Sequence, residues 1–206
     1  MCGGITSEYF YYFYNVKNNF NQRYNFMKGL MLLVMALFVY IMPASAQKEQ
    51  EDKYAAVELP HKIENIEIED ARGNPAKFPY WGEKNLLIFY VDPDRHSQNH
   101  EFTVDMEENK YAAGDNIYGL GVLNLRDTWL PNSIVRTLAR KLTEKNGALI
   151  LSDIDRSLAQ KWGLGDCNNK FVLMIISKEG ELVFCRKGEF SEQDKKEFIE
   201  TVQQYR

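Results

Sequence analysis

A continuous apolar run, NLLIFYV at residues 85–91, decides the fold of this chain. Runs of this kind are typical of strands that are covered on both faces at the centre of a sheet. Residues 92–94 (DPD) end the run, a helix is predicted over residues 97–113, and a second apolar strand is predicted at 117–125. A strand, a helix and a strand in this order predict a parallel pair.

The alternation of strands and helices continues to the end of the chain. Helices are predicted at 131–145, at 153–162 and after Ser191, with a short extended piece at 148–151 and a hairpin of strands at 171–177 and 181–186. Asp94 or Ser97 is expected to cap helix 97–113, and Ser191 with Asp194 to form a capping box. Together these elements predict an α/β domain whose mixed sheet carries helices on both faces.

An extra hairpin is predicted in front of this core. Residues 62–69 (KIENIEIE) alternate between apolar and charged side chains, as in a half-buried strand. Residues 70–74 have turn chemistry, and residues 75–80 are expected to return as a second short strand.

This order of elements is similar to that of thioredoxin-like proteins. Three segments carry the resemblance: Leu59-Pro60 through residues 70–73 (DARG), residues 86–94 (LLIFYVDPD), and residues 152–164. The resemblance covers about residues 57–205 and implies a thioredoxin-like mixed sheet with an N-terminal β-hairpin extension.

Within that superfamily the chain most resembles the YtfJ-like group of exported bacterial proteins. The similar segments are residues 159–164, 171–184 and 188–191. They are accompanied by an arginine, Arg95, where a redox cysteine is expected.

Thioredoxin chemistry needs two cysteines in a C-x-x-C motif at the start of the helix that follows the first core strand. A helix N-terminus lowers the pKa of a thiol and so stabilises the thiolate. The corresponding residues here are Arg95-His96-Ser97-Gln98, which contain no thiol, and the loop 165–170 lacks the usual cis-proline. The resemblance therefore implies no ordinary thiol–disulfide exchange, and whether the protein is an enzyme stays open.

Two cysteines lie within the predicted domain, Cys167 and Cys185. Cys185 is expected opposite residues 173–174 in the closing hairpin, and a disulfide between the two cysteines would require the loop around Cys167 to fold back. The alternatives are an inert pair of thiols, or a one-cysteine redox role for Cys167 near the position of the missing proline.

His96 and His100 offer a second chemistry. If the helix starts early enough, the two imidazoles stand one turn apart and could bind a divalent metal ion with a nearby carboxylate. The alternative is that these are solvated side chains near a helix start, and that the protein has no cofactor.

An apolar segment of 14 residues at 29–42 (GLMLLVMALFVYIM) has the length of a signal-peptide core, which is roughly 7–15 residues. Ala44 and Ala46 give the A-x-A pattern that a signal peptidase recognises, so residues 27–46 are expected to be a signal peptide starting at Met27. A retained membrane anchor is the alternative. Residues 1–26 are then upstream sequence translated by mistake, or else a long leader.

Residues 47–56 are polar and are expected to be a flexible tether to a thioredoxin-like domain at 57–206. The whole chain has 206 residues, a net charge of −4 and 45% apolar residues, which indicates a globular protein and excludes the basic surface of a nucleic-acid binder.

The sequence therefore predicts an exported protein, periplasmic in a Gram-negative source and secreted otherwise, with no membrane span after signal cleavage. Its partner is a protein or a small ligand, and the vestigial active-site loop at Asp94, Arg95, His96, Ser97 and Gln98 is the expected site. A redox protein using Cys167, alone or with Cys185, and a metal-binding protein using His96 and His100 are the alternatives.

Overall fold

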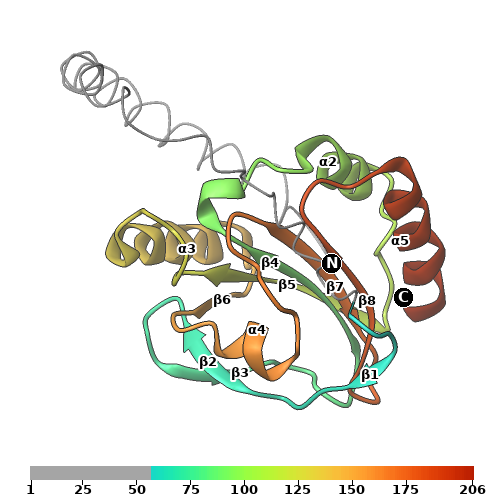
Figure 1. Ribbon diagram of the computed structural model, residues 1–206, viewed down its shortest axis with the longest axis horizontal. Coiled ribbons are helices and arrows are strands. Elements are labelled where there is room, and N and C mark those ends of the chain that lie inside the picture. Colours follow the sequence, from blue (N-terminus) through green and yellow to red (C-terminus); the bar gives the residue numbers. More distant parts are fainter. Residues whose placement is uncertain (1–56) are drawn as a thin grey trace, which may run out of the picture.

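The computed structural model describes residues 57–206, apart from the side chains of residues 145 and 146, as one mixed sheet with helices on both faces (Figure 1). The eight strands lie in the order β1-β8-β7-β4-β5-β6-β2-β3. Their bounds are β1 His61–Lys62, β2 Glu67–Asp70, β3 Pro75–Lys77, β4 Asn85–Val91, β5 Ile117–Asn124, β6 Ile150–Asp153, β7 Phe171–Ile176 and β8 Glu181–Lys187. The expected segments 1–26, 27–46 and 47–56 lie outside the described residues.

The predicted central strand, β4, is buried along its whole length. It pairs in parallel with β5, which pairs in parallel with β6, and antiparallel with β7, which continues the sheet through β8 and β1. The parallel half and the antiparallel half therefore meet at β4, as the mixture of crossover helices and a closing hairpin predicts.

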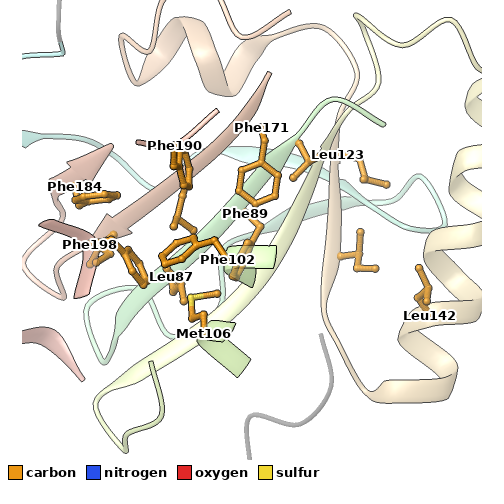
Figure 2. Close-up of a cluster of buried hydrophobic side chains, with 14 of the residues drawn as sticks. Leu87, Phe89, Phe102, Met106, Leu123, Leu142, Phe171, Phe184, Phe190 and Phe198 are labelled. Atoms are coloured by element: carbon orange, nitrogen blue, oxygen red, sulfur yellow. The ribbon is translucent and has the colours of Figure 1, made fainter. Parts of the chain in front are cut away.

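The helices divide between the two faces. The first face carries α2 (His100–Glu108), α3 (Asn132–Asn146) and α5 (Glu192–Tyr205), whose apolar side chains share one buried cluster with the sheet. Figure 2 shows the aromatic part of this cluster, where the rings of Phe102 in α2 and Phe198 in α5 meet edge to face with centroids 5.6 Å apart. The second face carries α4 (Ser157–Lys161), with Leu158 and Trp162 buried against the sheet.

The prediction of a single strand at 62–69 is wrong. Residues 61–62 form β1 beside β8, whereas residues 67–70 form β2 beside β6, near the opposite edge of the sheet. The intervening segment crosses the face that carries α4, where Ile63 and Ile66 are buried. An extended crossing buries alternate apolar residues as a strand does, so the same pattern fits both. The predicted return strand is confirmed in shorter form as β3, which pairs with β2.

Two helices start later than predicted. Helix α2 begins at His100 rather than near residue 97, after a short 3-10 turn, η1 (Pro93–Arg95). Its N-cap is Asn99 in a left-handed conformation without a side-chain cap, so neither Asp94 nor Ser97 caps it. Helix α4 is likewise shorter than the predicted 153–162.

The capping box of the last helix is confirmed. The Ser191 hydroxyl accepts the backbone N–H of Asp194 at 3.2 Å, and the Asp194 carboxylate accepts the backbone N–H of Ser191 at 2.9 Å. Within residues 57–206, no helix has the length and apolar character needed to span a bilayer.

Candidate functional site

Most of the candidate site residues lie at one edge of the sheet. Parallel strands β4, β5 and β6 all end at this edge, and antiparallel β7 begins there. The loops after three strands and the loop 165–170 before β7 therefore converge, which is where open α/β sheets carry their ligands.

The polar residues of the loop after β4, the predicted site at 94–98, differ in their exposure to solvent. Arg95 and Ser97 are exposed. His96, by contrast, is only 2% exposed, and its Nδ1 lies 2.9 Å from the carbonyl oxygen of Pro93. The carboxylate of Asp94 accepts the backbone N–H of Trp129 at 3.1 Å, which joins this loop to the loop after β5.

The same loop is fastened to the start of β7. Asp92 is completely buried and accepts the backbone N–H groups of Asp94 at 2.9 Å and Asn169 at 2.8 Å. The side-chain oxygen of Gln98 accepts the backbone N–H of Phe171 at 2.9 Å. Burial raises the pKa of the Asp92 carboxyl, although both backbone donors favour its ionised form.

Asn99 fastens the end of the loop to the segment after β8. Its side-chain amide donates to the carbonyl of Gly188 at 2.8 Å and accepts the backbone N–H of Phe190 at 2.8 Å. This side chain bonds to distant backbone groups and does not cap α2, and the left-handed backbone of Asn99 keeps the helix from starting before His100.

The two histidines are not one helical turn apart on α2. His96 lies before the helix and is buried, whereas His100 is its first residue and is exposed. Among residues 57–206, no three His, Cys, Asp or Glu side chains are grouped as metal ligands would be. A metal site here would need ligands beyond the pair that the sequence suggests.

Both cysteines of the domain are buried free thiols on the face that carries α4. Cys185 lies opposite Met174 in the β7–β8 ladder, as predicted. Burial raises the pKa of Cys167 to about 12, against the opposing effect of the Lys187 ammonium, and raises that of Cys185 to about 11. A thiol with so high a pKa carries almost no thiolate at neutral pH and is a poor nucleophile.

A buried phenol–carboxyl pair lies below the ends of β4 and β6. The Tyr90 hydroxyl donates to Asp153 at 3.1 Å, and both residues are fully buried. Asp153 also accepts the backbone N–H of Leu158 at 3.1 Å, which fixes the start of α4. Burial raises the pKa of both Tyr90 and Asp153.

An open pocket of about 580 Å³ lies beside this pair, between α4, the loop after β5 and residues 163–167. Asp127 and Arg156 both line it and form an ion pair, with the Arg156 Nε donating to the Asp127 carboxylate at 2.7 Å. Cys167 also contributes to the wall. A charged pair and a thiol therefore both line this pocket.

Comparison with known proteins rests on structure alone. No family model and no curated protein matches the sequence. Among solved structures, a hypothetical protein from Sinorhizobium meliloti 1021 is similar with a TM-score of 0.52 and 16% identity over 73% of this chain and 85% of that chain.

Two further structures are similar to the same degree. A proposed protein disulfide isomerase from Bacteroides thetaiotaomicron has a TM-score of 0.51 and 14% identity, over 72% of this chain and 90% of its own. A proposed thioredoxin from Neisseria meningitidis has a TM-score of 0.50 and 18% identity, over 69% of this chain and 89% of its own. The fold is thioredoxin-like.

Residues 95–98 lie between β4 and α2, and the loop 165–170 lies directly before β7. Among the described residues 57–206, the cis peptide bond precedes Pro60, outside that loop. Residues 95–98 provide an exposed arginine and serine, a buried histidine and an amide whose oxygen accepts the backbone N–H of Phe171.

Sequence reasoning missed Asp127 and Arg156 as site residues. Both lie in the loops that follow core strands, Asp127 after β5 and Arg156 after β6. Polar residues at the ends of successive parallel strands meet at one edge, so this placement was a usable signal. The left-handed backbone of Arg156, with φ of 65°, carried no signal because glycine and asparagine are the usual residues there.

Proposed function

We propose that this protein is an exported thioredoxin-fold binding module of the cell envelope, related to the YtfJ-like group, that carries out no dithiol exchange. The observation that carries the proposal is that the loop 92–99 is hydrogen-bonded to neighbouring parts of the sheet edge. The side chains of Asp92, Gln98 and Asn99 form hydrogen bonds with backbone groups near β7 and β8. A loop bound in this way supports the sheet edge and leaves binding to the surface beside it.

The state of the two thiols also supports a binding role. Cys167 and Cys185 are both buried, and their raised pKa values of about 12 and about 11 disfavour the thiolate that exchange requires. Neither lies at the start of a helix, where the dipole would lower the pKa.

A redox role for Cys167 is the second candidate, and one observation favours it. Cys167 lines the open pocket, so a small oxidant could approach it, and the nearby Lys187 ammonium works to lower its pKa. Because burial has the larger effect on this pKa, the binding role is preferred.

Insulin reduction by the domain 57–206, with dithiothreitol as the electron donor, separates the two candidates. We expect insulin to precipitate at the rate of dithiothreitol alone, for the wild type and for Cys167→Ser alike. We also expect alkylation of the native thiols at pH 8 to be more than about 100-fold slower than in urea, because so little thiolate is present. Catalysed precipitation that is lost in Cys167→Ser would contradict the binding proposal and favour the redox one.

Export is tested by the intact mass of the protein produced in a bacterial host. Cleavage after Ala46 leaves Gln47 as the first residue, and a mass that starts at Met1 or Met27 in the envelope fraction would contradict this part of the proposal. Zinc titration followed by thermal unfolding tests the metal alternative, for which His100→Ala is the matched variant.

A further inference from the structure

The open pocket beside α4 has a distribution of charge that indicates the class of its ligand. Its volume of about 580 Å³ falls within the 300–1,000 Å³ that small-molecule sites occupy. Three charged side chains line it, Asp127, Arg156 and Asp166, together with the amide of Gln160.

The acidic side of the pocket is already neutralised. The side chain of Asp127 is only 2% exposed and is held by Arg156 and by the amide of Asn124, which donates at 2.6 Å. Asp166 lies 3.2 Å from the ammonium of Lys170. Neither carboxylate is therefore placed to attract a cation as its own ligand.

The hydrogen-bond donors of Arg156, the basic residue of the pocket, are only partly occupied. The Arg156 side chain remains 48% exposed, and its contacts with Asp127 occupy two of its five N–H donors. Its backbone is left-handed, with φ of 65°, a conformation that costs a non-glycine residue about 1–3 kcal/mol and persists only where the surrounding structure imposes it.

The opposite wall consists of backbone. Gly163 and Gly165 both have left-handed φ values, 62° and 68°, and a Cβ at Gly163 would meet no atom within 4 Å. The Lys187 ammonium lies 3.7 Å from the Cβ position of Gly165, so a second cation stands behind this wall. Buried Ala159 and Cys167 add apolar surface.

We propose that this pocket binds a small organic molecule through a single carboxylate group, which the Arg156 guanidinium recognises. A carboxylate fits the remaining edge of the guanidinium, while the apolar part of the ligand lies on Ala159 and Cys167. A phosphate dianion is disfavoured because the pocket lining offers the charge of one guanidinium, which is already paired with Asp127. The inference rests on the proposed binding function and names the ligand class.

Butyrate, butyramide and inorganic phosphate are the probes that test it. Each is titrated into ¹⁵N-labelled domain, and the backbone amide signals of Gly163, Gly165 and Cys167 are followed by NMR. We expect butyrate to shift these signals in a saturable way, and the isosteric neutral butyramide to bind about tenfold more weakly because it lacks the charge. Phosphate is expected to bind more weakly than butyrate.

Two variants assign the effect to the pocket. Arg156→Gln should weaken butyrate binding about tenfold, and Gln160→Glu, on the exposed surface of α4, should weaken it by placing a like charge in the pocket. Arg95→Gln is the matched control, because Arg95 is exposed on the same sheet edge but does not line the pocket. Gln160→Glu keeps the test valid if Arg156→Gln fails to fold.

The inference is overturned if butyrate leaves the pocket signals unmoved, if butyramide or phosphate binds as tightly as butyrate, or if Gln160→Glu binds like the wild type. Insulin reduction judges the proposed function separately. A domain that binds butyrate through Arg156 and also reduces insulin would overturn the proposed function and keep this inference.

Discussion

Two neighbouring parts of one sheet edge differ in what their polar side chains do. In the loop 92–99, after the central strand, Asp92, Gln98 and Asn99 direct their side chains onto backbone groups near β7 and β8. The pocket beside α4 keeps an arginine half exposed and leaves its glycine wall open. The first part is closed by its hydrogen bonds, and the second has room for a ligand.

The difference bears on the proposed function. Gln98 accepts the backbone N–H of Phe171, and exposed Arg95 and Ser97 bring no thiol to this loop. Under the proposed function the loop stabilises the sheet edge, and the neighbouring loops after β5 and β6 bind the ligand.

Removing the hydrogen bonds that Asp92 accepts should have the largest effect on stability. Asp92→Ala removes a completely buried side chain and leaves the part-buried backbone N–H groups of Asp94 and Asn169 without this acceptor, and we expect a loss of about 3 kcal/mol in the free energy of unfolding. Urea denaturation of the domain measures it. Asp166→Ala, which removes an exposed carboxylate from the pocket, is the control and should lose less than about 1 kcal/mol. Equal losses of stability for Asp92→Ala and Asp166→Ala would contradict the proposed difference between the loop 92–99 and the pocket.

The pH dependence of stability should identify the buried carboxyl below the pocket. Burial raises the folded-state pKa of Asp153, so between its unfolded and folded pKa values the folded state holds more protons. The contribution of Asp153 is therefore greatest below the unfolded pKa of about 3.9 and is lost as the pH rises through the folded pKa, at up to about 1.4 kcal/mol per pH unit.

Asp153→Asn removes this titration while keeping an oxygen that can accept from Leu158. The stability of the wild type relative to this variant should fall as the pH is raised from 4, measured by urea denaturation at each pH. A difference that rises with pH would mean that hydrogen bonds to the carboxylate outweigh its burial.

The sequence was sufficient to predict those strands and helices whose hydrophobic pattern fits a single kind of structure. The apolar runs at β4 and β7 and the hairpin with β8 are predicted because only strands covered on both faces need them. The segment 62–69 was misassigned because alternation fits a crossing chain as well as a strand. The late start of α2 depends on bonds from Asn99 to Gly188 and Phe190, about 90 residues away, which no local pattern contains.

The sequence indicated the loop 94–98 at this sheet edge, but it did not indicate the pocket beside α4. The resemblance located the edge and the absence of thiols in the loop 95–98. The inward direction of His96 and the reach of Arg156 to Asp127 depend on backbone conformation and on loops far apart in sequence.

Helix capping gives a smaller contrast between a polar side chain that caps and one that does not. Ser191→Ala removes the hydroxyl that accepts the Asp194 N–H, and should reduce the free energy of unfolding by about 1 kcal/mol. Ser97→Ala should change it by less than about 0.5 kcal/mol, because Ser97 is exposed and does not cap α2. Urea denaturation of both variants checks the pair, and a larger loss for Ser97→Ala would restore the predicted cap.

The smallest effect is expected at Trp129, where the two parts of the edge meet. Its side chain is 58% exposed, and the link to Asp94 runs through its backbone N–H, which alanine retains. Trp129→Ala should therefore change the free energy of unfolding by less than about 0.5 kcal/mol, whereas Asp94→Ala, which removes the acceptor, should cost about 1 kcal/mol. A large loss for Trp129→Ala would mean that the exposed ring itself holds the two loops together.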